Sequence, residues 1–216
     1  MTIVKICGIT NVEDAVCAVD AGADMLGFIF YPPSPRSVTI ENAKAIASAI
    51  GKWQIAICHL PIVMVGVFVN ETPEHMLQVL AQTGMDAIQL SGNESIETLR
   101  ALNNTGYKVV RKLHEAFAFG GQQTHPALPE LVLEADHPTL YGGTGQRANE
   151  QLALQLAQQH RLMLTGGLTA DNVAAVVQAV QPWGVDVASG VEASKGKKDH
   201  AKVRAFVQNA KAGAKP

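Results

Sequence analysis

Short runs of β-branched and other apolar residues alternate along the chain with stretches of helical periodicity. A strand is predicted over Ile3–Cys7, a helix follows a capping Asn11, and a second strand spans Met25–Phe30. Further strands are predicted over Val63–Val69, Ala87–Leu90, Lys108–Lys112, Leu131–Ala135, Leu162–Thr165 and Val185–Ala188. Further helices are predicted over Thr39–Ile50, Pro73–Gln82, Ile96–Asn103, Asn149–Gln159, Ala170–Val180 and Asp199–Ala210.

This alternation predicts an α/β protein built around a parallel sheet. Eight strands, each followed by a helix except in the stretch 114–129, fit a single-domain (β/α)8 TIM barrel over residues 1–216. We expect an irregular or missing helix after the fifth strand, because Gly, Gln, His and Pro replace any helical period there. An open doubly wound sheet is the alternative. Against it, the first strand leads into CGIT, which lacks the glycine fingerprint of dinucleotide-binding folds.

Composition and charge exclude several classes of partner. The chain has 216 residues, 47% of them hydrophobic, which is enough to bury a core of its own. The 17 Lys and Arg against 19 Asp and Glu form no basic cluster, which argues against nucleic acid and anionic membranes as partners. The sequence suggests neither a signal peptide nor a membrane span, so we expect a cytoplasmic protein. Its cysteines are far apart, which favours free thiols.

The segment 52–62 is more apolar than a surface loop should be. We expect it to cover part of the barrel or to contact another subunit, because large exposed apolar patches mark interaction sites. Both a monomer and a homodimer are compatible with the sequence.

Glycines follow the seventh and eighth predicted strands, at the end of the barrel where active sites of this fold lie. The backbone amides of Gly166, Gly167, Ser189 and Gly190 are predicted to bind a phosphate. Adjacent helix N-termini offer several N–H donors and a favourable dipole to such a group. The alternative is that these glycines only make tight turns.

Two carboxylates and a third glycine-rich loop follow the sixth predicted strand. Glu134 and Asp136 are two residues apart, so in an extended chain they point the same way, and either is placed to donate a proton near the strand end. Alternatively, either is a loop carboxylate in water. The adjoining loop YGGTG contains Gly142 and Gly143, and we expect it to cover the ligand or to offer its own amides.

Other polar residues near strand ends are candidates for chemistry. Cys7 can serve as a general base or nucleophile if nearby positive charge lowers its pKa, or it is a small buried hydrophobe. Arg36 follows a proline-stiffened loop and either binds a carboxylate or phosphate or is solvated. Asp186 lies in an apolar strand and needs a partner, as a structural acceptor or as a support of the site. Gln89 and Ser91 end the fourth strand.

The seven histidines are scattered and show no ligand spacing, so no metal site is predicted.

Several strings occur in order along nearly the whole chain, namely VKICGIT, GFIFYPPSPR, VGVFVN, AIQLSG, YGGTG, LTGGLTADNV and VDVASGVEASKGKKDH. Together they resemble the phosphoribosylanthranilate isomerase family of tryptophan biosynthesis. This resemblance implies an Amadori rearrangement without a cofactor, in which N-(5-phosphoribosyl)anthranilate becomes 1-(2-carboxyphenylamino)-1-deoxyribulose 5-phosphate.

The resemblance also implies roles for residues. A general acid protonates the furanose ring oxygen so that the ring opens to a Schiff base, and a general base then removes the proton from C2. By the family pattern Cys7 is that base, and Arg36 holds the anthranilate carboxylate. The implied phosphate contacts are Gly166, Gly167, Ser189 and Gly190.

The chain departs from the family pattern at two positions. The family acid is usually an Asp in LLDA or LLDT, whereas this chain reads LVLEAD. Counting back from YGGTG favours Glu134, while a shorter loop would favour Asp136. Ser91 stands where the family commonly has His in QLHG, which removes a ring and a potential hydrogen-bond partner of the substrate.

Two other functions remain as alternatives. A neighbouring phosphosugar barrel, such as an epimerase or an indoleglycerol-phosphate synthase, would share the phosphate loops, but its metal ligands or catalytic lysines are lacking. A non-catalytic phosphosugar-binding protein would have kept the phosphate site and lost turnover through the changes at Glu134 and Ser91. Binding without isomerisation would identify it.

Overall fold

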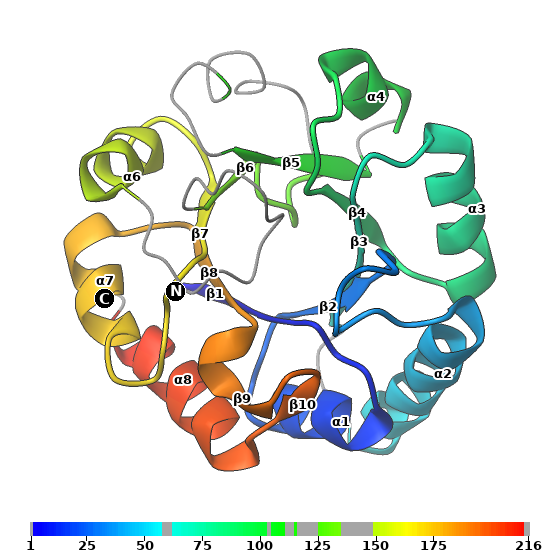
Figure 1. Cartoon of the computed structure of the whole chain (residues 1–216). Helices are drawn as coiled ribbons and strands as arrows, with labels where there is room; N and C mark the ends of the chain where they lie inside the picture. Colours follow the sequence, from blue (N-terminus) through cyan, green and yellow to red (C-terminus); the bar gives the residue numbers. More distant parts are fainter. Residues whose placement is uncertain are drawn as a thin grey trace.

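The computed structural model describes residues 2–57, 62–102, 105–110, 115, 125–134 and 149–213, with the backbone alone at 53–57, 109 and 110. Parallel strands β1 to β8 close into a barrel in which each strand pairs with the next and β8 pairs with β1 (Figure 1). The TIM barrel predicted from the sequence is therefore confirmed. The strands are β1 (Ile3–Cys7), β2 (Met25–Ile29), β3 (Val63–Phe68), β4 (Ala87–Leu90), β5 (Gly106–Val110), β6 (Leu131–Leu133), β7 (Leu162–Leu164) and β8 (Gly184–Val187).

Helices form a ring outside the barrel (Figure 1). They are α1 (Val12–Asp20), α2 (Ile40–Ile57), α3 (Pro73–Thr83), α4 (Ile96–Ala101), α6 (Glu150–Ala157), α7 (Val173–Val180) and α8 (His200–Ala212). Side-chain caps fix where several of them begin, because a side-chain oxygen there accepts a hydrogen bond from an otherwise unpaired backbone N–H. The capping residues Asn11, Thr72, Ser95, Asn149 and Asp199 each accept such a bond.

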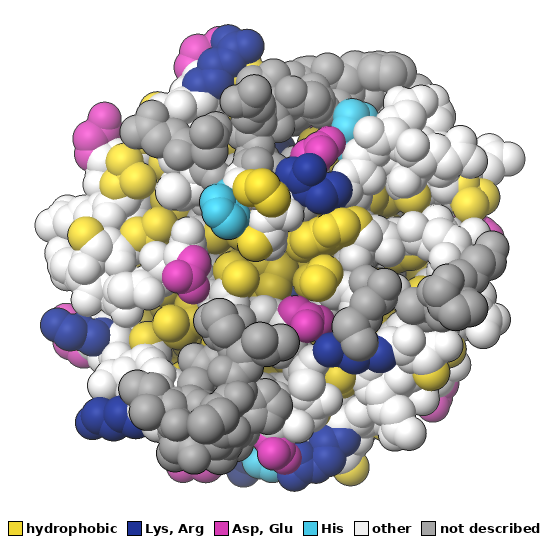
Figure 2. Space-filling model, turned by 180° about the vertical axis from the view of Figure 1, so that it is seen from behind, with side chains coloured by type: hydrophobic (Ala, Val, Ile, Leu, Met, Phe, Trp, Pro, Cys, Tyr) yellow, Lys and Arg dark blue, Asp and Glu magenta, His cyan; other side chains and the backbone are white. Residues whose placement is uncertain are grey.

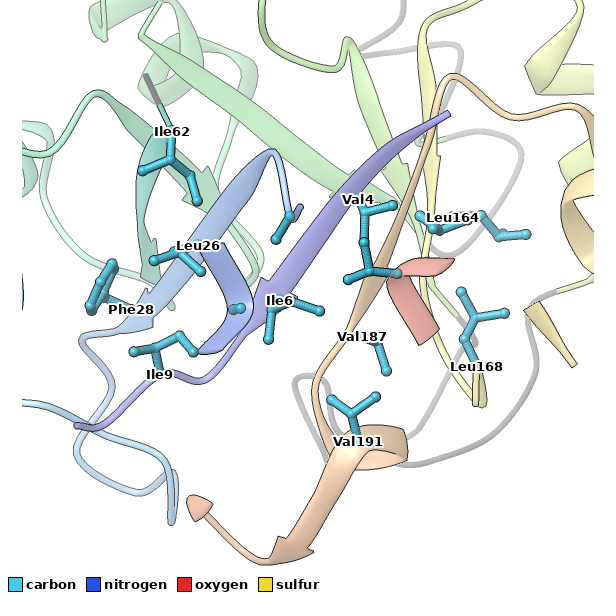
Figure 3. Close-up of a cluster of buried hydrophobic side chains, with 14 of the residues drawn as sticks. Val4, Ile6, Ile9, Leu26, Phe28, Ile62, Leu164, Leu168, Val187 and Val191 are labelled. Carbon is cyan, nitrogen blue, oxygen red and sulfur yellow. The ribbon is translucent and has the colours of Figure 1, made fainter. Parts of the chain in front are cut away.

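Alternate residues of each strand face opposite sides of the barrel wall. On β1, Val4 and Ile6 belong to the buried cluster that lies between the strands and the helices (Figure 3). Ile3 packs instead against a second cluster, whose members come from β2 to β7 and from Leu128 just before β6, and which fills the barrel interior. Lys5 and Cys7 share the parity of Ile3, so they lie on the interior side as well.

The structure corrects some element boundaries. α2 continues to Ile57 instead of ending near Ile50, so its backbone takes up the first part of the apolar segment 52–62. No proline interrupts that segment before Pro61, and the helix therefore has no early stop signal. Residues 58–61 lie outside the described part, and the prediction that this segment covers the barrel or contacts a subunit stays a prediction.

β5 begins at Gly106, two residues earlier than predicted. The irregular helix expected over 114–129 falls largely on residues outside the described part, which includes only 115 and 125–129 of that stretch.

The sequence did not predict the short elements between β8 and α8. They are a 3-10 turn, η1 (Ser189–Val191), and a hairpin of β9 (Glu192–Ser194) and β10 (Lys197–Lys198). The backbone N–H of Lys198 donates to Asp14 of α1 at 2.8 Å, and the hydroxyl of Thr10 donates to the carbonyl of Gly196 in the hairpin turn. These bonds hold the hairpin against the start of α1 (Figure 1).

Figure 2 shows the face opposite to that of Figure 1. Hydrophobic side chains gather near its centre, and charged side chains of both signs are interspersed around them. No helix in the described ranges is long and apolar enough to cross a membrane.

Candidate active site

The carboxyl ends of β6, β7 and β8 surround a pocket with about 300 Å³ of empty space. Its lining contains several residues that the sequence predicted for the site, which are Glu134, Gly166, Gly167, Asp186, Ser189 and Gly190. The pocket lies where TIM-barrel enzymes carry their active sites. The barrel thus brings together residues that three separate strand ends supply.

The glycines of this pocket are required by its backbone geometry. Gly166 and Gly167 have φ angles of 92° and 63°, in the left-handed region that favours glycine. A Cβ at Gly190 would lie 1.9 Å from the carbonyl oxygen of Leu168, so a side chain there would push the two loops apart. The loops after β7 and β8 thus line the pocket with backbone that no side chain covers at these glycines. Successive backbone N–H groups in such a loop can bind an anion.

Glu134 lies at the end of β6. Val132 belongs to the cluster inside the barrel, and Glu134, two residues further on, keeps that side of the strand. It is 7% exposed and lines the pocket. Asp136, Gly142 and Gly143 lie outside the described residues. Of the two candidate acids, the structure therefore describes only Glu134, and it lies at the pocket.

Cys7 is buried at the end of β1. A Cβ on Gly27 of β2 would lie 2.7 Å from its sulfur, so glycine at that position makes room for the thiol. Burial raises the pKa of Cys7, and the ammonium groups of Lys5 and Lys198 offset this only in part. The protonated thiol is therefore the resting form at neutral pH.

A polar network crosses the barrel interior next to Cys7. The Lys5 ammonium donates to Gln89 Oε1 at 2.9 Å and to Asp186 Oδ1 at 3.1 Å. The Tyr107 hydroxyl donates to the same Gln89 oxygen at 3.2 Å, and Gln89 Nε2 donates to Ser91 Oγ at 3.1 Å. Asp186 is therefore both a structural partner of Lys5 and part of the pocket wall. Gln89 orients Ser91 from inside the barrel.

The Lys5 ammonium stays charged inside the barrel. Burial alone would lower the pKa of Lys5, but the nearby Asp186 carboxylate raises it instead. The positive charge of Lys5 therefore lies close to the Cys7 thiol. It lowers the pKa of this thiol and so offsets part of the effect of burial.

Arg36 lies beside Cys7 and is paired with Glu192 of the hairpin. Its Nε and Nη2 donate to the two carboxylate oxygens of Glu192 at 2.7 and 2.8 Å. A Cβ on Gly8 would lie 2.7 Å from Cδ of Arg36, so the arginine stem crosses directly over the residue after Cys7. The solvated alternative for Arg36 is wrong, because the residue is only 8% exposed.

Sequence reasoning missed several members of this site. Lys5 carried the same signal as Asp186, a charge in an apolar strand, and it lies two residues from Cys7 on the same side. Tyr107 gave no signal, since an aromatic residue in a strand is ordinary. Glu192 and Lys198 belong to a hairpin that the periodicity did not predict.

Within the described residues, no group of three or more His, Cys, Asp or Glu side chains is arranged to hold a metal ion.

Comparison with known proteins identifies relatives along almost the full length. The family of N-(5'phosphoribosyl)anthranilate (PRA) isomerase matches residues 4–209. The chain is 44% identical to the N-(5'-phosphoribosyl)anthranilate isomerase of Roseiflexus castenholzii, covering 99% of this chain and 100% of that protein. It is 43% identical to the isomerase of Pelobacter propionicus, covering 96% and 95%.

Solved structures agree. The phosphoribosyl anthranilate isomerase of Thermotoga maritima superposes with a TM-score of 0.81 at 37% identity, covering 98% of this chain and 99% of that one. An isomerase of this name in complex with reduced 1-(o-carboxyphenylamino)-1-deoxyribulose 5-phosphate gives a TM-score of 0.78 at 36% identity, covering 98% and 99%.

Proposed function

Because this chain belongs to the family of N-(5'-phosphoribosyl)anthranilate isomerases, we propose that its barrel converts N-(5-phosphoribosyl)anthranilate into 1-(2-carboxyphenylamino)-1-deoxyribulose 5-phosphate in tryptophan biosynthesis, with Cys7 and Glu134 as base and acid. The observation that carries the assignment of the acid and of the phosphate contacts is the pocket in which Glu134, Asp186 and both glycine loops meet. Cys7 does not line this pocket, and its assignment as the base rests on the family pattern and on its place at the end of β1 beside the Lys5 ammonium. The reaction needs no cofactor, because it moves protons within one molecule.

The phosphate of the substrate binds to the backbone of the two glycine loops, which follow β7 and β8. Gly166, Gly167 and Gly190 leave the backbone of this pocket uncovered, and Ser189 adds a hydroxyl donor to the same pocket. Gly142 and Gly143 lie outside the described residues, and for them the sequence-based expectation stands that their loop covers the ligand or offers its own amides. Binding at this end, remote from the reacting carbons, orients the sugar between acid and base.

Ring opening comes first. Glu134 gives its proton to the furanose ring oxygen, the bond between that oxygen and C1 breaks, and the nitrogen lone pair forms the Schiff base. A Glu at this position is a methylene longer than the Asp common in the family, and its ordinary pKa is similar. Its burial at the pocket wall supports this role, because a carboxyl there is shielded from bulk water.

Proton abstraction follows. The resting Cys7 thiol first loses its proton to water, and the resulting thiolate removes the proton from C2. The electron pair of that C–H bond forms the C1–C2 double bond, and the pair of the C1–N double bond moves to the nitrogen, which gives an enolamine. The enol then tautomerises to the ketose. Lys5 and Lys198 favour the thiolate through their charge, which the base requires because burial opposes it.

Arg36 recognises the anthranilate carboxylate. Glu192 occupies Nε and Nη2 of the guanidinium, and we assign Nη1 to the substrate. Gln89 and Ser91 line the interior side of the site, where the Ser91 hydroxyl takes the place of the usual histidine. Its short side chain contributes less contact to the substrate than a ring would.

We further propose that residues 1–216 form one domain, that the enzyme works in the cytoplasm, and that it acts as a monomer or a homodimer. All barrel strands close on one another in one sheet, which supports a single domain. The related isomerase of Thermotoga maritima is dimeric, which is compatible with a homodimer here.

Fluorescence decay of freshly made phosphoribosylanthranilate, on adding purified metal-stripped protein, tests the activity. We expect rapid decay with the parent, and a loss of roughly 100-fold or more in Glu134→Ala but little change in Asp136→Ala, since a general acid contributes about that factor. Loss in Asp136→Ala alone would transfer the acid role to that residue. Substrate binding without decay in the folded parent protein would instead identify a non-catalytic binding protein.

A further inference from the structure

Three charged side chains form a cluster beside Cys7, outside the groups assigned to proton transfer. They are Arg36 from the loop after β2, Glu192 of β9 and Lys198 of β10. Glu192 Oε1 accepts from Arg36 Nε at 2.7 Å, from Lys198 Nζ at 3.2 Å and from the backbone N–H of Gly196 at 3.3 Å. Its other oxygen accepts from Arg36 Nη2 at 2.8 Å. The carboxylate is therefore fixed from several directions.

Lys198 ties this cluster to the barrel wall. Its ammonium donates to the carbonyl of Cys7 at 2.7 Å and to the carbonyl of Ala188 at 3.1 Å. These carbonyls lie at the ends of the neighbouring strands β1 and β8. With its side chain fully buried and all these donors engaged, Lys198 can hold Glu192 at a fixed distance from the strand that carries Cys7.

The cluster combines two cations with one carboxylate. Burial alone would raise the pKa of Glu192, but the hydrogen bonds and charges of Arg36 and Lys198 lower it, so the carboxylate is ionised at neutral pH. With both cations charged, the cluster carries one positive charge in excess, although burial lowers the pKa of Lys198. Among the described residues, the edge of the guanidinium that Glu192 does not occupy can meet an anionic substrate group.

We propose that Glu192 is a positioning residue that aims Arg36 at the substrate carboxylate, and that Lys198 fixes Glu192 for this task. A guanidinium is planar, so a carboxylate that binds two of its nitrogens sets the direction in which the third one points. Glu192 itself does not touch the substrate. The proposal rests on the carboxylate-binding role proposed for Arg36.

Two inhibitors measure this selectivity directly. One is reduced 1-(2-carboxyphenylamino)-1-deoxyribulose 5-phosphate, and the other is the same compound with a phenyl ring that lacks the carboxylate. The ratio of their inhibition constants gives the preference for the carboxylate. In Glu192→Gln this preference should fall roughly tenfold or more, the value of a charge-assisted hydrogen bond, while affinity for the carboxylate-free compound stays within about threefold.

Other variants separate the possible failures. Arg36→Met should abolish the preference, and if it does not, the role of Arg36 itself is wrong. If Arg36→Met abolishes the preference while Glu192→Gln keeps it, only the positioning role fails. An equal loss of affinity for both inhibitors in Glu192→Gln would show a merely structural residue. Lys197→Gln, on the exposed side of the same hairpin, is the matched control and should change neither constant.

If Glu192→Gln does not fold, Glu192→Asp gives the answer. It keeps the charge but is a methylene too short to bind both Arg36 and Lys198 as observed. A reduced carboxylate preference in the folded Asp variant supports the positioning role, and an unchanged preference overturns it.

Discussion

At the scale of single residues, the proposed chemistry requires the thiolate of Cys7, whose ionisation burial disfavours. Cys7 is buried, and the groups that favour its thiolate are ammonium groups held by other charges. Lys5 is kept in place by Asp186 and Gln89. The reactivity of Cys7 is therefore a property of its surroundings and cannot be assigned to the cysteine alone.

The first prediction concerns the titration of this thiol. In a variant with Cys17→Ala and Cys58→Ala, Cys7 should ionise above the ordinary thiol pKa of about 8.5, because burial stabilises the neutral form. Thiolate absorbance in the ultraviolet follows the titration. Adding Lys5→Met should move the midpoint to still higher pH, since a positive charge is lost. A midpoint at or below the ordinary value in the parent would contradict the burial argument.

Gly27 provides a second prediction at this scale. In Gly27→Ala the new Cβ would lie 2.7 Å from the Cys7 sulfur, so the thiol must move. We expect a loss of stability of about 1–3 kcal/mol from overpacking and, if Cys7 is the base as proposed, a fall in kcat of about 100-fold from its displacement. Chemical denaturation and steady-state kinetics measure the two effects.

The matched control is Gly51→Ala, which lies within α2 where a Cβ would meet nothing within 4 Å. It should raise stability by about 0.5–1 kcal/mol and leave kcat unchanged. An active Gly27→Ala enzyme would show that the thiol tolerates displacement.

At the scale of elements, buried charges hold the loops at the mouth of the barrel. Glu94 accepts the backbone N–H groups of Asn70 and Gly92, which belong to the loops after β3 and β4. Lys108 of β5 pairs with the same carboxylate at 2.7 Å, and both side chains are at most 4% exposed. One buried ion pair therefore fixes two neighbouring loops, including the one that carries Ser91.

This pair yields the third prediction. Lys108→Met should destabilise the protein by about 3–5 kcal/mol, because it leaves the Glu94 carboxylate buried without its counter-charge. Thermal and denaturant unfolding measure the loss. For comparison, Asp20→Asn breaks a pair with Arg204 in which both side chains are more than half exposed, at 54% and 57%, and should cost less than about 1 kcal/mol. Equal costs for the two variants would contradict the importance of burial.

At the scale of the whole molecule, the hairpin after β8 connects parts of the chain that are far apart. Glu192 and Lys198 join it to Arg36 and to the ends of β1 and β8, and Asp14 joins it to α1. Closure of the barrel between its first and last strands is thus reinforced by charges as well as by the β1–β8 hydrogen bonds. The stability of the closed barrel should therefore depend on pH.

The fourth prediction gives the direction of that dependence. The pKa of Glu192 is lower in the folded protein than in the unfolded chain, so its stabilising effect is complete above the unfolded carboxyl value of about 4.3 and is lost as pH falls through the folded value. The difference in unfolding free energy between the parent and Glu192→Gln should therefore shrink when the pH is lowered from neutral towards 3. A difference that grows on acidification would contradict the assigned ion cluster.

The sequence alone determined the alternation of strands and helices, because their signals depend on local periodicity and on residues next to one another in the chain. Closure of the sheet into a barrel, which the sequence predicted with an open sheet as the alternative, was decided by the pairing of β8 with β1. It also identified the glycines, Glu134 and Asp186 at strand ends, since the fold places all strand ends on one face. The pairing of Arg36 with Glu192, and of Lys5 with Asp186, was decided only by the tertiary structure. These partners are more than 150 residues apart, and no local pattern specifies which buried charge a distant side chain will meet.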